Sequence, residues 1–170
     1  MNSLIAKLVS LSLIVNPEGG TGNCKKDCQI SENGLALIRT FEGYSPFIYK
    51  DSAGLDTIGY GHLVVKGDNI PEPLLPEDAN KILLKDTEKA VKGLNKYTHV
   101  TLKQNQADSL ISFTYNVGVG SLSKSTLVKK VNEEKHEEVP NQFMRWVRAG
   151  GKVIKGLVTR RETEANLYKQ

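Results

Sequence analysis

Two carboxylates in contrasting settings are the residues of this sequence best suited to chemistry. Glu42 ends an apolar helical segment, where partial burial favours the protonated form that a general acid needs at neutral pH. Asp51 follows in a polar turn beside Lys50, where it should stay ionised. Hydrolysis of a glycosidic bond requires such a pair, because one carboxyl group protonates the leaving oxygen while the other activates water or stabilises the developing cation.

Thr57 adds a hydroxyl group on the next extended segment of the chain. It could hold the attacking water, which needs a second partner besides the base to fix its direction. The three residues alone are a weak signal, because a helix-end glutamate beside a turn aspartate is also an ordinary structural arrangement.

Hydrophobic periodicity predicts the elements that must position these side chains. A helix capped by Ser31 is expected to end at Glu42, with Gly43 following it. Residues 57–65 are β-branched and alternating, which predicts a strand or hairpin arm. Pro76 opens a sequence typical of a helix start, and this helix would connect two lobes.

The later part of the chain is predicted to be mostly helical. Helical spacing from Ala107 to Thr114 predicts a helix that ends at Gly118 and Gly120. Further helical stretches are expected over about 124–135, 139–149 and 159–168. We expect the second to stop at glycines 150–151 and the third to open on a capping box at 159–162. The fold class is therefore α+β, with a small β-containing lobe early and a larger helical lobe late.

Composition narrows the range of function classes. The length of 170 residues fits one domain, or one domain with two lobes. A composition of 39% apolar and 25% charged residues excludes a multi-pass membrane protein and a long disordered polyelectrolyte. Residues 101–170 carry 12 basic and 7 acidic groups, so this part of the chain has a net positive charge. Such a charge would attract nucleic acid, anionic lipid or bacterial cell wall, or it could serve only to keep the protein soluble. Aromatic residues are only 6% and do not interleave with the basic ones, which argues against nucleic acid.

Residues 1–29 differ from the rest and are expected to be an export segment and linker before a domain at 30–170. Lys7 precedes an apolar run over 8–15, which Pro17 and a glycine-rich stretch then break. This order resembles a secretory signal, with a flexible N-terminal arm as the alternative. The run is too short for a transmembrane span.

Cysteine and histidine do not form a recognisable metal motif. Cys24 and Cys28 lack the zinc-ligand spacing and a second pair, so a local disulfide and two inert thiols in a linker both remain open. His62, His99 and His136 are widely separated, and His62 is expected to tie its strand to a neighbouring element. We therefore expect no metal ion.

Several spaced motifs around the carboxylates resemble the phage-type lysozymes, the endolysin family also called muramidases. The likeness covers roughly residues 30–168. The motifs that carry it are Phe41-Glu42-Gly43, the spacing on to Asp51 and Thr57, Ile58-Gly59-Tyr60-Gly61-His62, the stretch from Phe113 to Gly120, Ser125-Thr126-Leu127, Trp146, Ala149-Gly150-Gly151, Gly156-Leu157-Val158 and Arg160-Arg161-x-x-Glu164.

The resemblance implies a two-lobed lysozyme-like fold that binds a sugar chain in the cleft between its lobes. It implies hydrolysis of the β-1,4 bond between N-acetylmuramic acid and N-acetylglucosamine in peptidoglycan, causing bacterial lysis without a cofactor. Glu42 matches the family's general acid, Asp51 its second carboxylate and Thr57 its water-positioning residue. Family members commonly invert at the anomeric carbon, and a water-activating role for Asp51 fits that outcome.

Three further positions match places where the family contacts its substrate. These are Leu63, Tyr115 and Thr126, for which core packing, helix packing and a helix cap are the ordinary structural alternatives. Arginines such as Arg145 and Arg160 could form a basic patch toward the anionic wall, or pair with acids on their own helices.

Other functions for the same fold are less well supported by these residues. A lytic transglycosylase would not need Asp51 and Thr57 together around a water molecule, and a non-catalytic wall-binding module would be indicated by loss of Glu42. A monomer is expected, exported to reach the wall or held in the host cytoplasm until a holin releases it. Phage-encoded and host-secreted origins both remain open.

Overall fold

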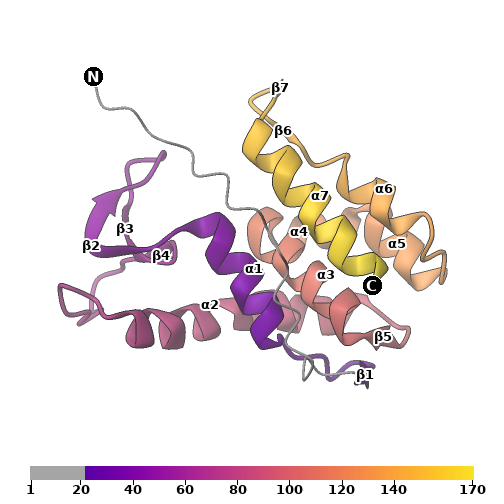
Figure 1. Ribbon diagram of the computed structural model, residues 1–170, viewed down its shortest axis with the longest axis horizontal. Coiled ribbons are helices and arrows are strands. Elements are labelled where there is room, and N and C mark those ends of the chain that lie inside the picture. The colour runs from indigo at the N-terminus through magenta and orange to yellow at the C-terminus, as the bar shows by residue number, and fades with distance from the viewer. Residues whose placement is uncertain (1–21) are drawn as a thin grey trace.

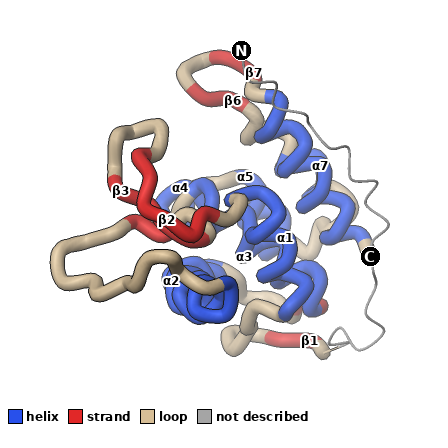
Figure 2. Tube along the Cα trace, turned by 60° about the vertical axis from the view of Figure 1, so that its left-hand side comes forward, coloured by secondary structure: helices blue, strands red, loops and turns tan. Residues whose placement is uncertain are grey.

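The long helix α3 (Gln104–Val117) is the centre of the larger lobe. It packs against α1 (Glu32–Glu42), α2 (Pro76–Tyr97), α4 (Val119–Lys124) and α7 (Lys155–Lys169), and Figures 1 and 2 show it enclosed by them. Its residues 106–114 are all buried, so the helix is covered on every side rather than along one stripe. Phe113 meets Phe143 and Trp146 edge-on in this core. The computed structural model describes residues 22–170.

The small lobe is a three-stranded antiparallel sheet in the order β2-β3-β4. Its strands are β2 (Ser45–Lys50), β3 (Asp56–Gly59) and β4 (His62–Leu63). Ile58 packs with Leu74 and Ala79 in a second, smaller core, separate from the one around α3. Figure 1 shows α2 running from beneath this sheet to the helical lobe. The predicted α+β arrangement of a small β lobe joined by a helix to a larger helical lobe is confirmed.

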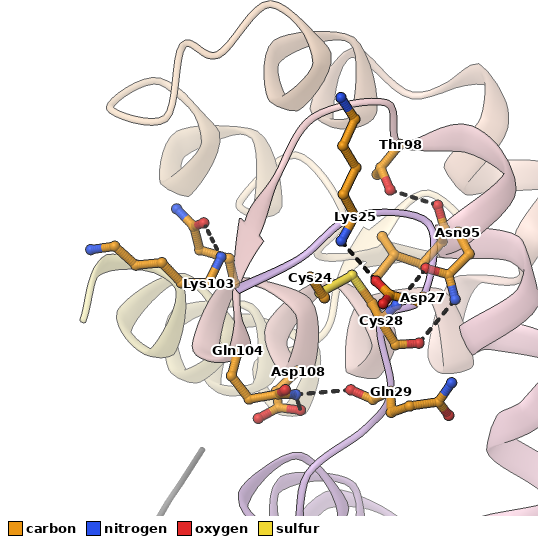
Figure 3. Close-up of a disulfide and its surroundings, with 12 residues drawn as sticks. Cys24, Lys25, Asp27, Cys28, Gln29, Asn95, Thr98, Lys103, Gln104 and Asp108 are labelled. Atoms are coloured by element: carbon orange, nitrogen blue, oxygen red, sulfur yellow. Dashed lines mark hydrogen bonds between the residues drawn. A yellow bond between two sulfur atoms is a disulfide. The ribbon is translucent and has the colours of Figure 1, made fainter. Parts of the chain in front are cut away.

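A short N-terminal segment is fastened to the helical lobe by a strand pair and by hydrogen bonds to Asn95, and a disulfide closes a loop within the segment. β1 (Asn23–Cys24) pairs antiparallel with β5 (Leu102–Lys103), and Cys24 is bonded to Cys28. Asn95 of α2 accepts a hydrogen bond from the Cys28 amide and donates one to the Cys28 carbonyl, both at 2.9 Å (Figure 3). Of the two readings of the cysteines, the structure therefore has the disulfide. The signal-like run at 8–15 lies outside the described residues.

The predicted helix over 139–149 is wrong in its second half. The helix α6 (Val139–Phe143) is short, and the chain continues into a hairpin of β6 (Arg148–Ala149) and β7 (Lys152–Val153). Gly150 and Gly151 have φ of 54° and 77°, which is the left-handed geometry of a two-residue hairpin turn. The two glycines therefore turn a hairpin and do not end a helix.

Two other helix boundaries also differ from prediction. The helix predicted over about 124–135 is shorter in the structure. Lys124 is the last residue of α4, Ser125 caps the next helix, and this helix, α5, spans Thr126–Asn132. The last helix begins at Lys155, a full turn before the predicted capping box. Thr159 donates to the Lys155 carbonyl inside the helix and does not cap it. None of the helices within residues 22–170 is long and apolar enough to cross a membrane.

Candidate active site

Glu42 is the last residue of α1, as the pattern predicts, and the helix stops there for a local reason. Gly43 has a φ of 72°, which glycine adopts without steric cost, and its amide donates to the Arg39 carbonyl. The chain then turns away into the sheet. The Glu42 side chain is left about one quarter exposed (24%), between the two lobes rather than in either core.

The backbone at Gly61 approaches the Glu42 carboxylate closely. A Cβ atom at this position would lie 3.3 Å from Glu42 Oε2, and the φ of 81° also favours glycine. Gly61 lies in the turn between β3 and β4, so the sheet and the end of α1 meet at this point. Gly61 therefore marks a close approach of the backbone to the Glu42 carboxylate.

Arg160 is the partner of Glu42 that the sequence pattern does not reveal. Its Nη1 donates to Glu42 Oε1 at 2.8 Å across a sequence separation of 118 residues. The Arg160 side chain is only 5% exposed, and its guanidinium lies over the ring of Phe41 with 5.4 Å to the ring centroid. The interpretation of this arginine as part of a surface patch is therefore wrong, whereas its pairing with Glu164 on its own helix is confirmed.

Tyr115 of α3 lies in the electrostatic field of the same carboxylate. Burial raises the pKa of Tyr115, and the negative charges of Glu42 and Asp86 raise it further, while Arg160 opposes them. Its hydroxyl group therefore stays protonated at neutral pH and is available as a hydrogen-bond donor.

Asp51 lies in the turn between β2 and β3 and is held by the backbone. Its Oδ1 accepts hydrogen bonds from the amides of Ala53 at 2.8 Å and Leu55 at 2.9 Å. The neighbouring Lys50 pairs with Asp56 at 2.9 Å instead. These two backbone amides fix the position of the Asp51 carboxylate within its turn.

Thr57 lies in the middle of a row of side chains across the sheet. Tyr49 of β2 and Leu63 of β4 are its register partners, so the three side chains share one face, opposite the face that buries Ile58. Thr57 is 4% exposed, and its hydroxyl donates to the Leu55 carbonyl at 3.2 Å. Tyr49 and Leu63 are 40% and 45% exposed, so the alternative of a core role for Leu63 is wrong.

Thr126 belongs to a different part of the surface. It lines a pocket of about 260 Å³ on the helical lobe, together with Arg145 and Trp146. Ser125 caps α5, with its hydroxyl accepting from the Val128 amide, so the alternative of a capping role for Thr126 is also wrong. Among the hydrogen bonds of residues 22–170, none joins Thr126 to the residues around Glu42.

His62 connects the sheet to the connecting helix, as predicted. Its Nδ1 lies 2.8 Å from Asp86 Oδ2 on α2, and its Nε2 lies 3.4 Å from Asp68 Oδ2. The amide of Val65 donates to Asp68 and, as the largest influence, lowers the pKa of that carboxyl group. The histidine ring is thus occupied by carboxylates on both sides.

Comparisons with known proteins agree with this geometry. The phage lysozyme family model matches residues 39–164. An endolysin of Bacillus phage B103 is 41% identical over 142 residues, which cover 82% of this chain and 53% of that protein. An endolysin of Acyrthosiphon pisum secondary endosymbiont phage 1 is 36% identical, covering 82% of this chain and 97% of the relative.

Solved structures give the same result. An endolysin from Escherichia coli O157:H7 phage FAHEc1 has a TM-score of 0.78 and 35% identity, covering 85% of this chain and 96% of that one. The muramidase domain of SpmX from Asticaccaulis excentricus has a TM-score of 0.76 at 31% identity, covering 84% and 99%. The chain spans about half the length of the two Bacillus phage endolysins that it matches, at 53% and 55%. The resemblance predicted from the motifs is therefore confirmed, and the chain belongs to the phage lysozyme family.

Proposed function

We propose that this protein is a muramidase that hydrolyses the β-1,4 bond between N-acetylmuramic acid and N-acetylglucosamine in peptidoglycan, and so lyses bacteria. The observation that carries the proposal is the contrast between its two carboxylates. Glu42 is partly enclosed beside Arg160, whereas Asp51 is held by backbone amides in an open turn. Membership of the phage lysozyme family and the muramidase domain among the solved structures support the same activity.

The proposed reaction gives each group one task. Glu42 transfers its proton to the leaving glycosidic oxygen as the bond to the anomeric carbon breaks. The oxygen of a water molecule forms the new bond to that carbon, and its proton passes to Asp51. Thr57 orients this water, for which its hydroxyl would exchange its contact with the Leu55 carbonyl for one with the water. The products are a new reducing end and a free hydroxyl, and no cofactor is consumed.

The surfaces beside these groups suit a sugar chain. Tyr49 and Leu63 present apolar side chains next to Thr57, and sugar rings have apolar faces that can lie against them. Tyr115 keeps its proton and can donate to a sugar oxygen. We assign Thr126 a substrate contact as well, in its pocket with the cationic Arg145, where a carboxylate of the wall could bind.

The domain organisation and location follow from the same proposal. Residues 1–29 would serve export and linkage, and residues 30–170 catalysis. The protein would act as a monomer on the cell wall, which it reaches by export or, alternatively, from the cytoplasm after release. Relatives named as endolysins, among them the SAR-endolysin of bacteriophage PS119 at 39% identity, support action on the wall.

Mass spectrometry of the soluble products tests the proposed reaction. The full chain is incubated with purified peptidoglycan, and the released fragments are analysed. Muropeptides with reducing N-acetylmuramic acid ends are the expected result. Fragments lighter by one water, with 1,6-anhydro ends, would show a transglycosylase instead, and a folded protein that releases nothing would indicate a wall-binding module.

A further inference from the structure

A buried carboxylate, Glu164, lies behind the arginine that contacts Glu42. The Glu164 side chain is completely enclosed in the helical lobe. Its Oε1 accepts a hydrogen bond from Arg160 Nε at 3.2 Å and another from the Ser112 hydroxyl at 2.7 Å. The mechanism above does not use this group, although burying a carboxylate is costly unless its partners compensate.

Arg160 connects the two carboxylates directly. It donates from Nη1 to Glu42 and from Nε to Glu164, so one guanidinium is shared between a fully buried acid and a partly exposed one. Arg160 Nη2 is directed to the Ser112 carbonyl at 3.4 Å. These contacts fix the orientation of the guanidinium from behind, because its planar fork is held at several nitrogens.

Arg161 completes a compact group of four charges. Its Nε lies 3.1 Å from Glu164 Oε2, its Nη2 donates to Asn116 at 2.8 Å, and its guanidinium lies 5.0 Å from the centroid of the Phe113 ring. Two arginines therefore face two carboxylates, Glu42 and Glu164, with no net charge when both acids are ionised. Burial raises the pKa of Glu164, and Arg161, Arg160 and the Ser112 hydroxyl oppose that rise.

We infer that Glu164 is a positioning residue for the reaction, which holds Arg160 in place and divides its positive charge between two carboxylates. The inference rests on the proposed function, in which Glu42 is the acid. If the positive charge of Arg160 acted on Glu42 alone, it would strongly favour the ionised form of Glu42. A general acid, however, has to keep its proton until the glycosidic oxygen takes it. Glu164 limits this influence without touching the substrate.

Within residues 22–170, the other charged or titratable groups around Glu42 have partners of their own or stay neutral. Tyr115 faces it from α3 and stays neutral, and Asp86 of α2, which interacts with the same tyrosine, is bound to His62. Gly61 contributes only backbone from the sheet. In the part of the chain that the structure describes, Arg160 is therefore the cation that contacts Glu42, and Glu164 and Arg161 are the charged groups packed behind it.

The test is the pH profile of kcat/KM for Glu164→Gln, measured on the full chain with solubilised peptidoglycan fragments. The alkaline limb of such a profile reports loss of the proton from the acid. With one negative charge removed, we expect this limb to move to lower pH by about one unit, as an uncompensated cation nearby would cause. Glu164→Asp keeps the charge and should return the limb toward its original position.

Two matched controls separate positioning from other effects. Glu162→Gln makes the same charge change on an exposed face of the same helix, and Asp108→Asn neutralises a buried carboxylate on α3 away from Arg160. Neither should move the alkaline limb. A purely structural role for Glu164 would lower the melting temperature of its variant and leave the limb of the folded protein unchanged.

Specific outcomes overturn the inference. A folded Glu164→Gln whose alkaline limb coincides with that of the unmodified protein contradicts it, as does an equal shift in Glu162→Gln. If Glu164→Gln does not fold, Ser112→Ala replaces it, because loss of that donor favours protonated Glu164 and should move the limb in the same direction. An active Glu42→Gln would instead overturn the proposed function. If Glu42→Gln is inactive and the alkaline limb of Glu164→Gln does not move, the proposed function stands and only the positioning role of Glu164 is overturned.

Discussion

The two candidate catalytic carboxylates are supported in opposite ways. Glu42 depends on side chains from a distant part of the sequence, because Arg160 of the last helix contacts it and Glu164 of the same helix holds Arg160 from behind. Asp51 depends on its own turn, where the amides of Ala53 and Leu55 bind its Oδ1. One site is assembled by tertiary packing and the other by local backbone geometry.

This difference indicates how stability and activity are linked in the molecule. Substitution of Arg160 or Glu164 leaves a buried charge without its partner and should therefore reduce stability together with activity. Changes at Asp51 alter an exposed turn and should reduce activity while the fold stays intact.

The largest combined effect is expected for Arg160→Ala. The substitution leaves the fully buried Glu164 without one of its cations, a type of change that costs about 3–5 kcal/mol of stability. Urea unfolding measures this loss, and kcat/KM should fall with it. Arg148→Ala removes an exposed arginine from β6 and serves as the control. Equal stability of the two variants would contradict the account of Glu42.

Asp51→Asn should separate activity from stability. The amide oxygen of asparagine can still accept the hydrogen bonds of the turn, so unfolding should change by less than about 0.5 kcal/mol. Loss of the base should lower kcat/KM by about 100-fold or more. Asp56→Asn, an exposed aspartate in the same hairpin, should retain nearly full activity. A similar loss in both variants would show that charge near the hairpin matters, rather than the role of Asp51.

Thr57→Glu tests the water position beside Asp51. The longer acidic side chain would occupy the space assigned to the water, and activity should fall by about tenfold or more. Thr57 is buried, so melting has to be measured alongside activity to confirm a folded variant. Leu63→Ala changes the adjacent exposed position of the same row and should reduce turnover far less. Full activity in Thr57→Glu would remove Thr57 from the mechanism.

The disulfide is attached to β1, which lies at the lower edge of the helical lobe and apart from the sheet (Figure 1), so its loss should affect the scaffold alone. Replacing Cys24 and Cys28 by serine opens a short loop, for which chain entropy predicts a loss of about 2 kcal/mol. Thermal melting measures the change. Activity of the folded double variant at low temperature should equal that of the unmodified protein. A large loss there would mean that β1 influences the site.

A smaller, pH-dependent effect is expected at Asp108, where α3 meets the start of α1. Burial raises the pKa of Asp108 despite hydrogen bonds from Ser31 and Gln104. The folded state therefore holds this proton to higher pH than the unfolded state, and the contribution of Asp108 to stability falls as pH rises through the raised pKa. Asp108→Asn lacks this loss, so it should gain stability relative to the unmodified protein between pH 4 and pH 7. A constant difference in urea unfolding across that range would contradict the expectation.

Local patterns predicted the parts of the fold that local physics determines. The end of α1 at Glu42 follows from apolar spacing and the glycine after it, and the hairpin over 57–65 follows from alternation. The start of α2 at Pro76 follows from proline in the first turn. The order of spaced motifs then identified the family, which local patterns could not do.

Contacts between distant residues could not be predicted in this way. Nothing near Arg160 in the sequence indicates that it reaches Glu42, because only the packing of α7 on α3 brings it there. The glycines at 150–151 fit a helix stop and a hairpin turn equally well on a local reading. β1 and β5 are too short to carry any periodicity, and their pairing depends on the tertiary position of the disulfide segment.

The most direct test of the central claim is the activity of Glu42→Gln on purified peptidoglycan. Its control is Glu32→Gln, an exposed glutamate at the start of the same helix. Glutamine cannot donate the required proton, so we expect kcat/KM to fall by about 1,000-fold or more while the melting temperature stays near that of the control. A folded Glu42→Gln that retains more than about one tenth of the activity would contradict the assignment of Glu42 as the acid.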